Sequence, residues 1–178
     1  MMNEAMTNKL KSRGVFFFYE AYPAFTLSFL VLAVASLLLL VFVPQSEQFL
    51  FVNRLHHPIA DVGFQYITYG GDGLMMLLLA AILLFVRFKY AVYTVVCFAL
   101  TGLIAQAIKR SLEWPRPAKV FDGLHDIHIP QDYTVHFSNS FPSGHTTTAF
   151  AMMAILYYLF PNQRNSPFLF FMALLVGY

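Results

Sequence analysis

Residues 109–117 read K-R-S-L-E-W-P-R-P, and residues 141–145 read F-P-S-G-H. Each motif lies where a long apolar segment meets a polar one. Charged side chains at such a boundary are costly if they enter lipid, so they are seldom there without a function. The cations, the hydroxyl, the glycine and the histidine of these motifs are residue types suited to binding phosphate. We therefore take Lys109 to His145 as the stretch around which the other segments form a scaffold.

The composition indicates an integral membrane protein. Of the 178 residues, 58% are hydrophobic and 11% are charged, whereas soluble proteins contain about 25% charged residues. The net charge of +2 gives no argument for a nucleic acid partner. The single cysteine, Cys97, excludes an intrachain disulfide. The length fits one domain, residues 1–178.

Five apolar segments predict an all-α polytopic membrane helix bundle. A short interfacial helix is expected to begin at Pro58, and Arg87 and Lys89 mark a tight hairpin. The fifth segment is short: its twelve residues reach about 18 Å against a hydrocarbon core of roughly 30 Å. We therefore expect the C-terminal part of the domain to be missing. The predicted spans are residues 22–43, 71–88, 90–108, 143–160 and 167–178.

The positive charges predict the orientation in the membrane. One side has six Lys and Arg residues and the other has five, which barely separates them. Setting aside Lys109 and Arg116 as functional leaves six against three, so residues 1–21 are predicted to be cytoplasmic. Loops 44–72 and 109–142 are then extracytoplasmic. The two sets are Lys9, Lys11, Arg13, Arg87, Lys89 and Arg164 on one side, and Arg54, Lys109, Arg110, Arg116 and Lys119 on the other.

The first motif carries two cations, Lys109 and Arg116, followed by Pro117. A lysine offers a point charge and an arginine a planar fork of donors, and together they can hold one tetrahedral anion. Lys109 is expected on the last turn of a helix and Arg116 on extended chain fixed by proline. Taken alone, the pair is better explained by a snorkelling lysine and an arginine beside the membrane.

The second motif opens the fourth span. Ser143 is placed as an N-cap, and the free N–H groups of a helix start bind anions. Gly144 lets an oxyanion approach the backbone, and His145 stands in the first turn, where an acid or base can act. Taken alone, the motif fits a capped helix start with an interfacial histidine. Of residues 146–148, all threonines, one can face a substrate cavity.

Together, K-x6-R-P and P-S-G-H, about 25 residues apart, resemble two signatures of the type 2 phosphatidic acid phosphatase superfamily, which shares its site with vanadium haloperoxidases. The resemblance covers the chain from about Gly71 to its end, with a weaker likeness in residues 53–73. It implies a fold of six spans and a reaction without a metal or another cofactor. The chain shows five of these spans, the last one incomplete.

The resemblance also implies roles for five residues. Lys109 and Arg116 hold phosphate oxygens, Ser143 and Gly144 add a hydroxyl and a backbone N–H, and His145 is the general acid that protonates the leaving oxygen. The nucleophilic histidine belongs to a third motif, S-R-x5-H-x3-D. No such motif occurs in the 178 residues, and we expect it after the fifth span.

The favoured function is dephosphorylation of a lipid phosphate or pyrophosphate at the extracytoplasmic face of the inner (plasma) membrane, through a phosphohistidine intermediate. Phosphatidylglycerol phosphate, phosphatidic acid, undecaprenyl pyrophosphate and lipid A phosphate are all candidates, and the oligomeric state stays open. The alternative is a phospholipid-binding membrane protein without catalysis, or an inactive fragment.

Two weaker clusters are interpreted without a catalytic role. His57 and Asp61 have the spacing of the nucleophile pair, but Arg54 precedes His57 by three residues instead of six, so we predict an interfacial helix start. The loop 118–141 holds residue types that bind metals, but in no known ligand spacing. We interpret it as a solvated loop with a possible role as a lid or in headgroup contact. Its members are Asp122, His125, Asp126, His128, Asp132 and His136.

Overall fold

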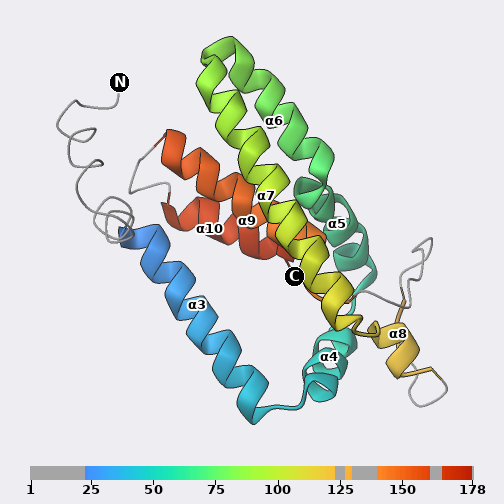
Figure 1. The fold of residues 1–178 in the computed structure, drawn as a ribbon. Helices are drawn as coiled ribbons and strands as arrows, with labels where there is room; N and C mark the ends of the chain where they lie inside the picture. Colours follow the sequence, from blue (N-terminus) through green and yellow to red (C-terminus); the bar gives the residue numbers. More distant parts are fainter. Residues whose placement is uncertain (1–22, 123–126, 130–139, 161–165, 178) are drawn as a thin grey trace.

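The computed structural model describes residues 23–122, 127–129, 140–160 and 166–177. These residues form helices and no strand, which confirms the all-α prediction. The elements are α3 (Pro23–Phe42), α4 (Gln45–Arg54), α5 (Pro58–Thr68), the 3-10 helix η1 (Tyr69–Gly71), α6 (Gly73–Val86), α7 (Phe88–Leu112), α8 (Pro117–Val120), α9 (Gly144–Leu159) and α10 (Ser166–Gly177) (Figure 1).

Helices α6 and α7 form the predicted hairpin. Arg87, in extended conformation, ends α6 and precedes α7. At the other end of α6, Asp72 Oδ1 accepts a hydrogen bond from Leu74 N at 3.2 Å and caps the helix. The buried residues of this hairpin include Ala80, Ala91 and other small side chains, which let helix backbones approach closely.

Helix α9 packs against both α7 and α10, and Figure 1 shows α10 and α7 on different sides of it. Gly71 lies where the first turn of α9 meets the end of α10. A Cβ on Gly71 would lie 2.6 Å from the carbonyl oxygen of His145 and 2.6 Å from Val176 Cγ1, so no larger residue fits without a shift. This close approach fixes the depth at which α9 begins.

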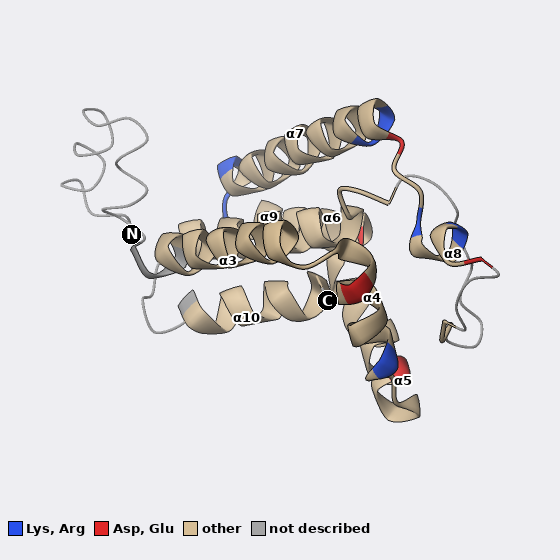
Figure 2. Ribbon diagram, turned by 90° about the horizontal axis from the view of Figure 1, so that it is seen from below, with Lys and Arg blue, Asp and Glu red and all other residues tan. Residues whose placement is uncertain are grey.

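The surface of the bundle is that of a membrane protein. Large apolar side chains are exposed along the helices, such as Phe85 at 93% and Phe42 at 77%, and contiguous apolar surface on this scale marks contact with lipid or a partner. Figure 2 shows Lys and Arg at the two ends of α7 and no charge along α3, α6, α9 or α10.

The number of spans stays a prediction. By length and composition, one helical stretch, Phe88–Val120, can cross a membrane among the described residues, and two bent pairs raise this number to as many as three. These pairs are Thr26–Phe42 with Gln45–Arg54, bent by 108°, and Pro58–Gly71 with Gly73–Val86, bent by 50°. The difference from five comes from helix length: α6, α9 and α10 have 14, 16 and 12 residues, fewer than the roughly 20 that cross a bilayer.

Two helices were not predicted. Helix α4 follows Pro44, and the Gln48 side chain donates to the carbonyls of Leu39 and Val43 at 3.1 and 2.8 Å, which joins α4 to the end of α3. Helix α8 is a single turn that starts at Pro117. The predictions for residues 1–21 and for Arg164 lie outside the described residues.

Candidate functional site

The first motif begins on the last turn of α7, as predicted. Lys109 and Arg110 lie in that turn; Lys109 is half-buried and Arg110 is exposed. The helix ends at Glu113, whose left-handed backbone (φ 46°) lets its N–H donate to the carbonyl of Lys109 at 3.0 Å. Pro115 follows two residues later and cannot continue the helix.

Arg116 has the extended backbone that was predicted, with φ −82° and ψ 156°. It is half-buried and stands at the N-cap of α8, where its carbonyl accepts hydrogen bonds from Lys119 N at 2.9 Å and Val120 N at 3.1 Å. The short helix therefore holds the backbone of Arg116 in place just beyond the end of α7.

The two motifs are joined through Trp114. Its carbonyl accepts a hydrogen bond from Ser140 N at 3.0 Å, and its ring lies 5.6 Å from the ring of Phe141. Trp114 is two residues before Arg116, and Phe141 is two residues before Ser143. The structure thus brings together chain segments that the loop 118–141 separates in sequence.

The second motif starts α9 as predicted. Ser143 is the N-cap: its Oγ accepts from Thr146 N at 3.3 Å. Its carbonyl accepts from Thr147 N at 3.1 Å and from Thr147 Oγ1 at 2.8 Å. This capping leaves the N–H groups of Gly144 and His145 at the open end of the helix. The side chain of His145 is exposed there.

Lys109 and Gly144 share a cavity of about 180 Å³ between α7 and α9. A Cβ on Gly144 would lie 3.9 Å from Lys109 Nζ, so the ammonium group lies close to the start of α9. Ser143, His145 and Arg116 do not line this cavity. Its lining residues are Gly102, Ala105, Gln106, Lys109, Gly144, Thr147 and Thr148.

The ammonium of Lys109 makes no ion pair or hydrogen bond with any residue that the structure describes. A partly buried cation without a counter-ion is unfavourable. The helix dipole adds partial positive charge at the start of α9. The cavity is therefore electrostatically suited to an anion.

The sequence analysis did not identify Gln106 as part of the cavity wall. Gln106 lies three residues before Lys109 and therefore on the same face of α7. A polar residue inside an apolar span is a signal that could have found it. Of the three threonines, Thr147 and Thr148 line the cavity, whereas Thr146 faces the end of α10, where its Oγ1 lies 3.5 Å from the carbonyl of Gly177.

Comparisons with known proteins decide the family. The family model described as the PAP2 superfamily matches residues 90–178, which is half of the chain and contains both motifs. This chain belongs to the PAP2 superfamily. The family predicted from the two motifs is therefore confirmed, and the chain is a member of a phosphatase superfamily.

The fold of this PAP2 protein is similar to the crystal structure of Aquifex aeolicus LpxE. The TM-score is 0.64 and the sequence identity 27%, over 74% of this chain and 75% of that one. No curated protein is similar enough to this chain to count as a match. The structural likeness and the apolar helices agree that this is a membrane protein of a lipid phosphatase family.

Proposed function

We propose that the cavity between α7 and α9 binds the phosphate group of a membrane lipid phosphate or pyrophosphate, which the protein dephosphorylates at the extracytoplasmic face of the inner (plasma) membrane. The observation that carries this proposal is the position of Lys109 Nζ beside Gly144, in one cavity and without a counter-ion among the described residues. A site at the end of membrane helices suits a substrate whose tail stays in lipid while its headgroup reaches water.

The five residues of the two motifs take separate roles in this proposal. Lys109 neutralises phosphate oxygens in the cavity, and Gly144 contributes a backbone N–H there. Arg116 and Ser143, which do not line the cavity, move towards the phosphate when it binds and add a second cation and a hydroxyl. His145, exposed at the same helix start, is the general acid. Fixed donors around the phosphate stabilise the charge that develops in the transition state without reorganising.

The chemical step needs a nucleophile from outside the 178 residues. The third-motif histidine attacks phosphorus, the bond from phosphorus to the lipid oxygen breaks, and His145 gives its proton to that oxygen as the lipid leaves. Water then attacks the phosphohistidine, His145 takes a proton from it, and orthophosphate is released. The end of α10 supports this route, because Gly177 packs on Thr146, next to His145.

Phosphate release from a panel of lipid phosphates tests the proposal. Release that persists in EDTA and is inhibited by vanadate supports hydrolysis by this site without a catalytic metal. Release that vanadate does not inhibit contradicts the proposed mechanism.

Lipid binding without catalysis is the second candidate, because Lys109 and the start of α9 can hold a phosphate headgroup without a nucleophile. Sequencing the gene beyond the codon for Tyr178 distinguishes hydrolysis from binding alone. An Arg, a His six residues later and an Asp four residues after that His support hydrolysis. A stop codon in that position supports binding alone.

A further inference from the structure

A second polar cluster lies outside the phosphate cavity, at the connection between α4 and α5. His56 follows the end of α4, Asp61 lies in the first turn of α5, and His128 comes from the segment between the two motifs. One ligand atom of each residue lies within 4.8 Å of the other two. The cluster therefore joins the α4–α5 connection to His128, which lies 67 residues after Asp61 in the sequence.

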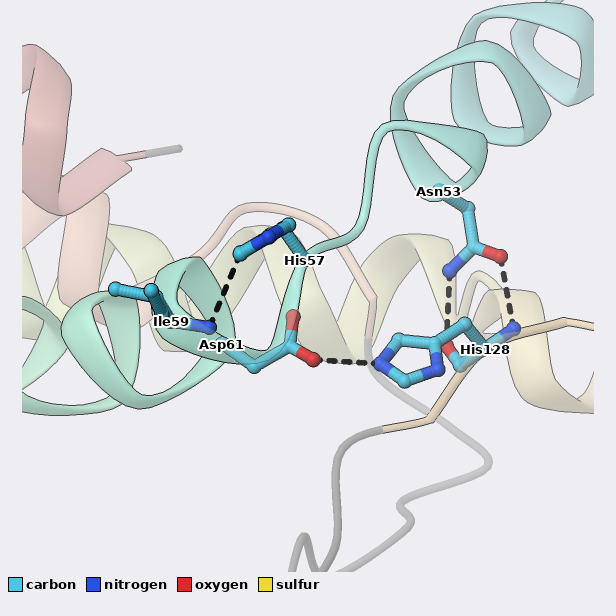
Figure 3. Close-up of polar contacts among 5 residues, drawn as sticks. All are labelled: Asn53, His57, Ile59, Asp61 and His128. Carbon is cyan, nitrogen blue, oxygen red and sulfur yellow. Dashed lines mark hydrogen bonds and ion pairs between the residues drawn. The ribbon is translucent and has the colours of Figure 1, made fainter.

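The structure holds these side chains in place. His128 Nε2 lies 2.7 Å from Asp61 Oδ2, and the rings of His56 and His128 stack at 3.9 Å with an angle of 12° between them. Asn53 holds the backbone of His128 on both sides: its Nδ2 donates to the carbonyl at 2.8 Å, and its Oδ1 accepts from the N–H at 2.9 Å (Figure 3). His128 and Asp61 are thus preorganised, which lowers the cost of binding an ion, whereas the exposed His56 must leave its stack on His128 before its nitrogen can face the same ion.

His57 is excluded from the cluster although it is the next residue after His56. Its Nδ1 accepts from Ile59 N at 3.3 Å and caps α5, so its ring points away from Asp61 and His128 (Figure 3). The predicted helix start at His57 and Pro58 is thus confirmed. The two adjacent histidines have different surroundings, which provides a matched control.

We propose that His56, Asp61 and His128 bind one Zn²⁺ ion. Two imidazoles and one carboxylate are typical ligands of zinc, with water in the remaining position, whereas Ca²⁺ and Mg²⁺ prefer oxygen ligands alone. Ligand atoms around tetrahedral zinc are about 3.3 Å apart, since each is about 2.0–2.2 Å from the metal. The 2.7 Å pair of His128 and Asp61 must widen by a small shift of either side chain. The exposed His56 must rotate its side chain to bring its nitrogen into place, from a separation of at most 4.8 Å.

The bound ion would fasten the segment that joins the two motifs to the α4–α5 connection. Asn53 then has a positioning role, because it fixes the backbone of a ligand without touching the metal. This site is separate from the proposed chemistry: none of its residues lines the α7–α9 cavity. The zinc proposal therefore stands or falls independently of the phosphatase proposal.

Zinc binding to the purified 178-residue chain in detergent tests the proposal, measured by competition with a chromophoric chelator and by metal analysis after gel filtration. We expect one zinc per chain and no binding of Mg²⁺ or Ca²⁺. His56→Asn, Asp61→Asn and His128→Asn should each weaken zinc binding at least about tenfold, and Asn53→Ala about 10- to 100-fold.

The control is His57→Asn, which removes an adjacent imidazole but keeps a residue that caps helices well. It should bind zinc as the parent chain does. Circular dichroism and gel filtration check that each variant is folded, and adding zinc should raise the midpoint of thermal unfolding of the parent and of His57→Asn only. The parent chain binding no zinc would overturn the proposal. So would equal binding in His56→Asn, Asp61→Asn and His128→Asn, or loss of binding on replacing His125 or His136 with His128 intact.

Discussion

At the α7–α9 cavity polar groups face an open space, whereas at the α4–α5 connection they face one another. Lys109 Nζ and the start of α9 border a cavity of about 180 Å³, and the ammonium has no partner among the described residues. Asp61, His128 and Asn53 are linked by contacts of 2.7 to 2.9 Å. The first site thus depends on an anion from outside, while the second holds a loop in place with or without an ion.

The largest expected effect separates chemistry from binding at the first site. In a protein that contains the third motif, His145→Ala should lower turnover about 10²-fold or more, because the leaving lipid oxygen loses its proton donor. Turnover is measured by phosphate release. The affinity for vanadate, measured by inhibition, should be retained. Near-normal turnover would remove His145 as the acid.

Lys109→Gln should weaken vanadate binding about tenfold to a hundredfold, because one charge-assisted hydrogen bond contributes about 1.5–3 kcal/mol. The measurement is vanadate affinity by titration of the 178-residue chain in detergent. The matched control is Arg110→Gln, which removes an exposed cation from the same helical turn. Equal losses in both variants would mean that net charge, and not the cavity, attracts the anion.

Gly71→Ala should lower the free energy of unfolding by about 1–3 kcal/mol, because the new Cβ overpacks the contact between α9 and α10. Thermal unfolding in detergent measures the effect. Gly63→Ala is the control: nothing lies within 4 Å of its Cβ position, so it should be neutral or stabilising by up to about 1 kcal/mol. Unchanged stability in Gly71→Ala would show that this contact does not set the depth of α9.

The smallest effect concerns the second site alone. Asn53→Ala removes both hydrogen bonds to His128 and should lower stability by about 1 kcal/mol, since both partners are partly exposed to water. Its vanadate affinity should stay within about twofold of the parent, because the two sites share no residue. A larger change in affinity would show that the two regions are coupled.

Features that depend on local sequence could be predicted. The helix start at Ser143, the hairpin at Arg87 and the end of α7 after Lys109 follow from capping groups, prolines and apolar runs. The family also followed from two short motifs. The placement of Lys109 and of Ser143 at helix ends was predicted for the same local reason.

Features that depend on contacts across the fold could not be predicted. The sequence gives no signal that Asn53 would hold His128, because the pairing spans 75 residues and depends on tertiary contact. Helix α4 was missed because its composition is mixed. Its contacts are made with residues outside the helix, such as those of Gln48 with the end of α3 and of Phe49 with Phe121. The loop 118–141 was interpreted as solvated, without a metal site. His125, Asp126, Asp132 and His136 lie outside the described residues, and the structure brings His128 to His56 and Asp61.

The hydrogen bond between Trp114 and Ser140 has a consequence for how the protein can be varied. It closes the chain between these residues into a side branch whose two ends lie together. Lengthening such a branch costs little, about 0.6 kcal/mol for each doubling of a flexible loop. The length of the branch can therefore vary while Lys109 and Gly144 keep their distance, provided that Arg116 and His128, which lie in it, are kept. The branch is therefore a place where an affinity tag can be inserted without moving Lys109 and Gly144 apart.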